Sequence, residues 1–184
     1  MYPGDNIMRH DRMPDTAFKL MNLAFKLMDL FHRPGKKLNT FGIQQGFTVV
    51  DYGCGPGRYL KTASELAGPS GKVYAADIHE LAIENARSIA EKHNLGNVET
   101  VLITEYSCPL EDETADLLYA LDMFHMVSKP EPFLRELHRL VKKNGILILE
   151  DGHQPRKVTK AKLDSVKIWD IVDETKQHLK CRPK

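Results

Sequence analysis

The chain has 184 residues, 42% of them apolar and 28% charged, a composition typical of one globular domain that excludes fibrous and disordered classes. Its 26 basic residues balance 25 acidic ones, so no overall charge favours nucleic acid or a membrane as partner. Three separated cysteines and the lack of a long apolar run indicate no disulfide framework, no metal site and no membrane span, and we expect a cytoplasmic protein.

The first predicted element is an amphipathic helix at residues 18–31. Polar residues recur there at steps of three and four, and apolar residues fill the remaining surface of the helix. A wide apolar face needs a cover, so this helix either packs on the core or forms a lid over a site. We expect residues 1–40 to form a helical cap segment and residues 41–184 to form the main domain.

In the main domain, strands and helices alternate along the chain. The pattern predicts strands at 47–52, 73–76, 98–103, 116–121 and 146–150, and helices at 59–67, 81–93 and 130–143. We expect Asn144-Gly145 to end the last of these helices. Beyond Lys157, a short helix and two strands near 168–173 and 178–182 are predicted. Such alternation forces parallel strands with right-handed crossovers, so the fold class is α/β, a doubly wound sheet with helices on both faces.

A glycine-rich segment, Asp51-Tyr52-Gly53-Cys54-Gly55-Pro56-Gly57, directly follows the first strand of the main domain. In an open parallel sheet the ligand site lies beyond the carboxyl ends of the strands, where this segment falls. Glycines let a ligand approach the backbone, and the free N–H groups of the next helix suit an anionic group. Asp77 ends the second strand, where a carboxylate can accept hydrogen bonds from ribose hydroxyls. A nucleoside cofactor is therefore indicated.

The spacing of the glycines distinguishes between two nucleoside cofactors. The dinucleotide fingerprint G-x-G-x-x-G requires a glycine where this chain has Arg58. An NAD(P)-dependent oxidoreductase is therefore disfavoured, although Asp77 is compatible with it.

Several segments resemble the class I S-adenosylmethionine-dependent methyltransferases. The segment Val49-Val50-Asp51-Tyr52-Gly53-Cys54-Gly55-Pro56-Gly57 is similar to motif I of this family, and Val73-Tyr74-Ala75-Ala76-Asp77-Ile78 is similar to its second-strand motif. Residues 115–121 and 133–150 resemble its fourth strand and the helix and strand that follow. The resemblance covers residues 47–184. It implies S-adenosylmethionine as cofactor and a seven-stranded sheet whose last strand is antiparallel.

The same resemblance implies roles for individual residues. Asp51 and the glycine-loop backbone would meet the methionine moiety, Asp77 the ribose hydroxyls and Ile78 the adenine. The family often places an acidic residue beside the adenine amino group, and by spacing this position falls on Thr104, with Glu105 next. The cofactor-binding residues that we predict are Asp51, Gly53, Cys54, Gly55, Gly57, Asp77, Ile78, Thr104, Glu105 and Leu121.

Few catalytic residues are needed for methyl transfer from a sulfonium, which mainly requires an aligned acceptor and the exclusion of water. A base is needed only when the acceptor must lose a proton. His125, after the fourth strand, is the candidate base because its ordinary pKa suits this task, although a histidine in Phe-His-Met can equally be a packing residue. His153 is the second candidate. We assign no role to Tyr106, Asp122 or the cluster His10-Asp11-Arg12.

The functional hypothesis is an S-adenosylmethionine-dependent methyltransferase that acts on a small-molecule acceptor. Compact size and balanced charge permit a small acceptor. A non-enzymatic subunit that binds an adenosyl cofactor is the alternative, followed by the oxidoreductase. The basic residues between 156 and 167 predict a solvated helix face rather than a nucleic-acid surface, because no aromatic residue lies among them. The sequence is also compatible with a homo-oligomer.

Overall fold

The computed structural model describes residues 11–29, 34–104 and 106–184. Its helices are α2 (Asp15–Asp29), α3 (Leu60–Ala67), α4 (Glu80–Lys92), α5 (Pro130–Leu140) and α6 (Arg156–Val166), with short 3-10 helices η1 (Pro34–Thr40) and η2 (Phe124–Met126). Its strands are β1 (Thr48–Tyr52), β2 (Lys72–Asp77), β3 (Val98–Leu102), β4 (Ala115–Ala120), β5 (Val141–Glu150), β6 (Trp169–Glu174) and β7 (His178–Pro183). None of the described helices combines the length and apolarity that crossing a membrane requires.

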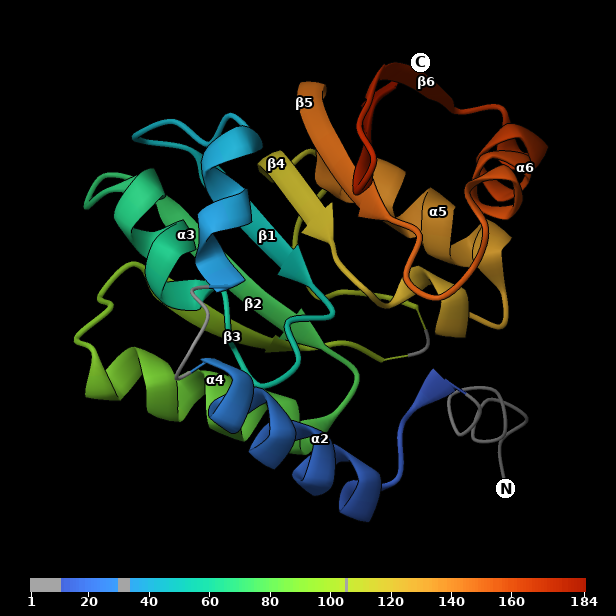
Figure 1. Ribbon diagram of the computed structural model, residues 1–184. Helices are drawn as coiled ribbons and strands as arrows, with labels where there is room; N and C mark the ends of the chain where they lie inside the picture. The colour runs from blue at the N-terminus through green and yellow to red at the C-terminus, as the bar shows by residue number, and fades with distance from the viewer. Residues whose placement is uncertain (1–10, 30–33, 105) are drawn as a thin grey trace.

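One sheet organises the described chain, with strand order β3-β2-β1-β4-β5-β7-β6 (Figure 1). Strands β1 to β5 pair in parallel, and β7 lies antiparallel to both β5 and β6. Because the order reverses between β1 and β4, the crossovers place helices on both faces of the sheet. The predicted doubly wound α/β sheet with an antiparallel last strand is confirmed.

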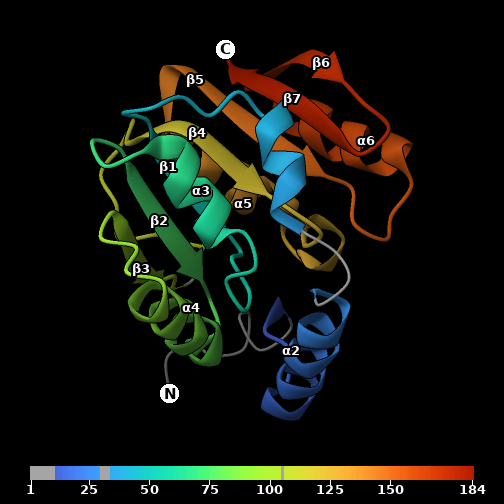
Figure 2. The same ribbon diagram turned by 60° about the vertical axis from the view of Figure 1, so that its left-hand side comes forward.

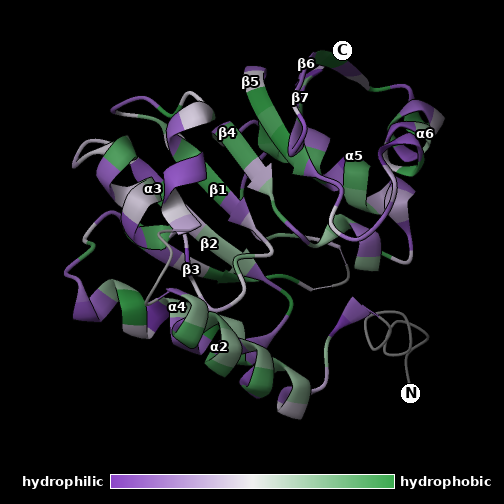
Figure 3. Ribbon diagram, viewed as in Figure 1, coloured by the Kyte–Doolittle hydropathy of each residue, from purple (hydrophilic) through white to green (hydrophobic). Residues whose placement is uncertain are grey.

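The core lies on both faces of the central strands. Val49 and Leu117 pack into one buried cluster with α3, whereas their chain neighbours Val50 and Leu118 pack into the other with α5. Successive side chains of a strand point to opposite faces, so a strand covered on both sides has to be apolar throughout. Figure 3 shows this hydrophobic character in β1, β4 and β5.

The boundary between α5 and β5 differs from the sequence prediction. The helix ends at Leu140, and β5 begins at once with Val141, which pairs with Ala115. The register then shifts, so that the next pair is Leu117 with Ile146. Asn144 and Gly145 therefore lie inside β5, and the prediction that they end the helix is wrong. A Cβ on Gly145 would lie 2.8 Å from the Ala115 carbonyl, so the glycine serves close backbone approach in an irregular strand.

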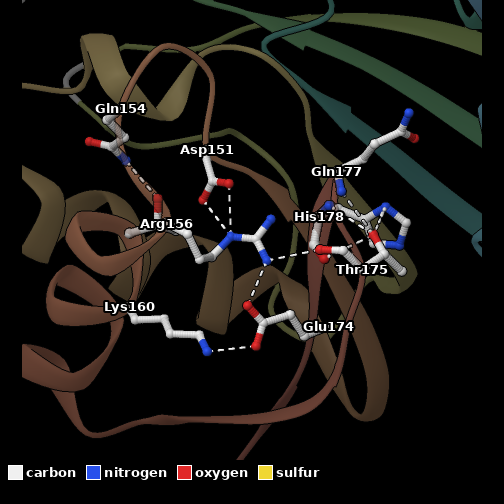
Figure 4. Close-up of polar contacts among 9 residues, drawn as sticks. Asp151, Gln154, Arg156, Lys160, Glu174, Thr175, Gln177 and His178 are labelled. Carbon is white, nitrogen blue, oxygen red and sulfur yellow. Dashed lines mark hydrogen bonds and ion pairs between the residues drawn. The ribbon is translucent and has the colours of Figure 1, made fainter.

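The C-terminal helix and hairpin form a unit held by polar contacts (Figure 4). The Arg156 guanidinium donates to both Asp151 carboxylate oxygens, at 2.9 and 2.8 Å, and to Glu174 at 3.0 Å. Lys160 also donates to Glu174, at 2.6 Å. Two of the basic residues expected on a solvated face thus fasten α6 to β6. The two strands predicted near 168–173 and 178–182 are present as β6 and β7.

The predicted helix at 18–31 corresponds to α2, and residues 30–33 lie outside the described part of the chain. Figures 1 and 2 show α2 outside the body of the sheet, at the end toward which β1 and β2 point. The Asn22 amide donates to Asn85 of α4 at 3.1 Å. The N-terminal helix therefore lies where an open α/β sheet binds its ligands.

Candidate functional site

A cavity of about 940 Å³, including its open mouth, lies at the carboxyl ends of β1, β2 and β4. Its walls are the glycine loop, the end of β2, the loop after β4 and the inner face of α2. In an open parallel sheet, ligands bind in the crevice beyond this end of the strands. The cavity is therefore the place to test each predicted site residue.

The glycine loop turns sharply from β1 and is fastened to β2. The amides of Gly53 and Cys54 both donate to the Ala76 carbonyl, at 2.7 and 3.1 Å. Gly55 has φ +52°, and no described atom lies within 4 Å of the place where a Cβ would stand. Gly57 has φ +81°, and its Cβ would meet Leu60 at 3.0 Å as well as α4. Gly55 leaves space for a ligand, whereas Gly57 lets two helices approach.

Asp77 lies in the cavity wall and orders the glycine loop. Its Oδ2 accepts from the Gly55 amide at 2.8 Å, and its Oδ1 accepts from the His79 amide at 2.9 Å. Burial raises the pKa of this carboxyl group. Each oxygen of a carboxylate has a second lone pair, so Asp77 can still accept from the ribose hydroxyls of an adenosyl cofactor.

Asp51 lies behind the loop rather than in the cavity wall. It is 1% exposed, and its Oδ2 makes no hydrogen bond of ordinary geometry among the described residues, although Tyr119 of β4 pairs with Asp51 in register and its hydroxyl lowers the pKa of the carboxyl group. Burial raises the pKa of Asp51 to about 8. A buried acceptor without a partner is unusual in a folded protein. A positively charged donor, such as the amino group of S-adenosylmethionine, would favour the deprotonated carboxylate of Asp51 and supply the missing hydrogen bond.

The predicted cofactor residues divide into three groups. Those that line the cavity are Gly53, Cys54, Gly55, Asp77, Ile78 and Leu121. Asp51 and Gly57 lie behind these residues and do not line the cavity. Thr104 is exposed and forms a small bridge with Ser107 instead of lining the cavity, and Glu105 lies outside the described residues.

Cys54 lies in the loop as a buried residue. Burial raises the pKa of its thiol well above the usual value, and its sulfur donates to the Gly55 carbonyl at 3.7 Å. A buried thiol that stays protonated is a poor nucleophile. The sequence interpretation of Cys54 as filler between glycines agrees with this environment.

The N-terminal segment supplies one wall of the cavity, although the sequence predicted no individual site residue in it. This wall consists of Asp11, Met13, Phe18, Met21 and Phe25. The apolar face of the predicted helix was the available signal, but it did not specify what the face covers. Asp11 had no such signal, because a polar residue near a terminus is usually solvated.

Arg58 joins the glycine loop to α2. Its guanidinium donates to both carboxylate oxygens of Asp29, at 2.9 and 2.5 Å, and lies 4.0 Å from the centre of the Phe25 ring. Two parallel charge-assisted hydrogen bonds are the strong form of an ion pair. The residue that replaces the third dinucleotide glycine thus connects the cofactor loop to the helix across the cavity.

A second set of contacts joins the beginning of α2 to the beginning of α4. The Phe18 and His79 rings lie 4.4 Å apart. Arg12 donates to Glu80 at 2.8 Å. Together with the Arg58 pair, these contacts hold α2 at both of its ends.

His125, the predicted base, lies beside the cavity but does not line it. Its ring is 4.7 Å from that of His153, and its Nδ1 is buried without a hydrogen-bond partner in the described chain. Burial lowers the pKa of His125, so the ring is neutral near pH 7. Asp122, which lines the cavity, has φ +52°, and its Oδ1 lies 3.9 Å from His153 Nε2.

Comparison with known proteins agrees with this geometry. The profile of a family described as "Methyltransferase domain" matches residues 43–180. The chain is 30% identical over 145 residues to a ubiquinone/menaquinone biosynthesis C-methyltransferase, UbiE, of Hahella chejuensis, covering 77% of this chain and 58% of that protein. The chain therefore spans little more than half the length of this curated relative.

Solved structures show the same fold. A SAM-dependent methyltransferase from Aquifex aeolicus superposes with a TM-score of 0.77 and 27% identity, over 93% of this chain and 97% of that one. A second structure, a putative S-adenosyl-L-methionine-dependent methyltransferase from Methanococcus maripaludis, has a TM-score of 0.76 at 18% identity, over 92% of each chain. The glycine loop, the carboxylate at the end of β2 and the matched family together show that the chain belongs to the Rossmann-like S-adenosylmethionine-dependent methyltransferases.

Proposed function

We propose that this methyltransferase modifies a small, largely apolar acceptor that binds between α2 and the loop after β4. The observation that carries the proposal is the set of thioether and aromatic side chains in the cavity lining, to which Met21, Phe25, Met123 and Met126 contribute. Thioether and aromatic side chains adapt to flat or irregular apolar molecules. A strongly charged acceptor would lose hydration here without enough polar partners.

Carbon is the accepting atom that we propose. The support is the name of the UbiE relative, a C-methyltransferase, at 30% identity. S-adenosylmethionine, when bound, supplies an electrophilic methyl group. A carbon acceptor has to lose a proton in the reaction, so a base beside the cavity is required.

We propose His125 as that base. Its lowered pKa keeps the imidazole unprotonated near neutral pH, which is the form that accepts a proton. It lies next in sequence to Met126, which lines the cavity. His153 is the second candidate, since its ring contacts that of His125.

We further propose that residues 1–40 act as a lid and residues 41–184 as the catalytic domain. The inner face of α2 lines the cavity, and the Arg58–Asp29 pair fastens this helix to the cofactor loop. Closing the helix over both ligands would exclude water from the transfer step.

The test is a methyl-transfer screen with methyl-labelled S-adenosylmethionine and the purified chain. The acceptors are electron-rich phenols and quinols with apolar side chains, short peptides, and transcribed RNA. We expect label in the organic extract of the phenol and quinol reactions, retained after treatment with hydriodic acid, which removes a methyl group from oxygen but not from carbon. Label confined to the peptides or the RNA would refute the small apolar acceptor.

A matched pair of variants tests the base. We expect His125→Asn to lower turnover, with cofactor affinity unchanged, because a proton-transfer group contributes about 10²–10⁴-fold. The control is His93→Asn at the distant end of α4, for which we expect unchanged turnover. Full activity of the His125 variant would remove it as the base.

A further inference from the structure

Asp11 lies in the cavity wall, although it precedes the family's matching region at residues 43–180. It also lines an adjoining apolar pocket that shares Tyr52, Ile78, Ile103, Met123 and Met126 with the main cavity and extends to Tyr106, Val127 and Phe133. Within the described residues, Asp11 is the only charged side chain that lines this adjoining pocket. A carboxylate in such surroundings requires donors.

Asp11 is held in place by two loops that are distant in sequence. The Tyr106 hydroxyl donates to its Oδ2, and the Ser128 amide donates to its Oδ1 at 3.0 Å. Tyr106 follows β3 and has φ +59°, a conformation that bulky residues rarely adopt. The N-terminal segment, the loop after β3 and the loop after β4 thus meet at this carboxylate.

These two hydrogen bonds leave acceptor capacity on Asp11. Each carboxylate oxygen has about two lone-pair sites, and each Asp11 oxygen accepts one of the bonds just named. The carboxylate can therefore accept a further hydrogen bond from a molecule in the pocket.

The chemistry of the cofactor indicates which donor this is. S-adenosylmethionine offers an amino group on its methionine part, the ribose hydroxyls and the 6-amino group of adenine. Asp51 lies behind the glycine loop and Asp77 at the end of β2, so they suit the first two donors. The adjoining pocket is lined by no described residue of 53–59, and the apolar side chains of Ile78 and Ile103 line it. This apolar lining suits the faces of a purine, and the amino group of adenine needs an acceptor.

We propose that Asp11 accepts a hydrogen bond from the 6-amino group of the cofactor's adenine. The N-terminal segment then supplies the residue that recognises adenine, whereas Thr104 forms a bridge with Ser107 and does not line the cavity. The proposal rests on the adenosyl cofactor and not on the identity of the acceptor. Cofactor binding and the position of the N-terminal segment are consequently coupled.

The test compares two ligands in calorimetric titrations without any acceptor. One is S-adenosylhomocysteine, and the other is its analogue with hydrogen in place of the 6-amino group. We expect wild type to prefer the amino compound by about 10–100-fold, as for a lost hydrogen bond to a charged group. Equal affinities in wild type would overturn the proposal without any variant.

Variants then assign the preference to Asp11. We expect Asp11→Ala to reduce it to below about threefold, and Asp11→Asn, which keeps an acceptor oxygen, to retain part of it. The matched control is Asp15→Asn, a nearby carboxylate that contacts Arg12 but does not line the cavity, for which we expect an unchanged preference. If Asp11→Ala weakens both ligands by the same factor, Asp11 only fastens the loops and the proposal is wrong.

This outcome is separate from that of the acceptor screen. The titrations contain no acceptor, so failure of the apolar-acceptor proposal leaves them unaffected. Conversely, the chain could be found to methylate a quinol but to bind both titration ligands equally. That result would support the proposed function and contradict only the role of Asp11.

Discussion

Two amphipathic helices lie near the cavity, α5 and α2, and they are held in different ways. The four side chains of α5 that are at most 1% exposed are Phe133, Leu134, Leu137 and Leu140. In α2 only Phe18 is buried, while Leu20, Leu23 and Leu27 are 56–70% exposed. Segments with few buried apolar contacts open at lower free energy than the core. We infer that α5 belongs to the fixed frame of the site and α2 to its movable side.

The contacts of α2 explain how a movable helix can still be specific. Its bonds run to the loop and helix that form the cofactor site, through Arg58 and Asn85, rather than into the core. A ligand that fills the cavity adds contacts to Met21 and Phe25 and so favours the closed position. We therefore expect α2 to be closed more often when a ligand occupies the cavity than when the cavity is empty.

The largest expected effect tests the fixed side. Leu137→Ala should lower the free energy of unfolding by about 2–5 kcal/mol, because it leaves a cavity in the core. The matched change in α2, Leu23→Ala, should alter it by at most about 0.5 kcal/mol, as for an exposed site. Urea unfolding without ligand measures both. Similar losses for the two variants would break the distinction between the helices.

The next effect concerns the cofactor carboxylate on the fixed side. Asp77→Ala should weaken S-adenosylmethionine binding by about 1–3 kcal/mol, because ribose hydrogen bonds to a buried charge are lost. Calorimetry measures the dissociation constant, with Asp116→Ala as a carboxylate control at the other end of β4. Unchanged affinity would remove Asp77 from the site.

The buried Asp51 makes stability depend on pH. Its pKa is about 8 in the folded protein and 3.8 as the ordinary value, so the folded state keeps a proton that the unfolded state loses. This stabilising contribution is complete below pH 4 and is lost as pH rises toward 8. Between pH 5 and 7, wild type should lose up to about 1.4 kcal/mol per pH unit relative to Asp51→Asn. If the free energy of unfolding, measured with urea, changes with pH by the same amount in both proteins, the raised pKa of Asp51 is wrong.

The smallest effect concerns the movable side. Removing the Arg58–Asp29 pair should raise hydrogen exchange in α2 by about fivefold, equivalent to ~1 kcal/mol, with global unfolding nearly unchanged. A double-mutant cycle with Arg58→Ala and Asp29→Ala isolates the pair. If exchange in α5 rises as much as in α2, the pair stabilises the whole domain instead of one helix.

The sequence alone was enough to predict the α/β sheet and the class of cofactor. Alternating strand and helix patterns led to the parallel sheet, the glycine loop followed by Asp77 led to a nucleoside cofactor, and the resemblance to the methyltransferase family identified this cofactor as S-adenosylmethionine. These signals are local, since each depends on residues within one βαβ unit. For the same reason the hairpin of β6 and β7 was predictable from its own short segment.

Tertiary structure decided the remainder. The early end of α5 follows from the pairing of Val141 with Ala115 across the sheet, which competes with helix signals in residues 141–145. Thr104, the predicted adenine position, does not line the cavity. Asp11 does, because it accepts hydrogen bonds from Tyr106 and Ser128, which lie 95 and 117 residues away in sequence. Such contacts have no local periodicity or spacing to reveal them, because they form only when the folded sheet brings its loops and the N-terminal segment to the same edge.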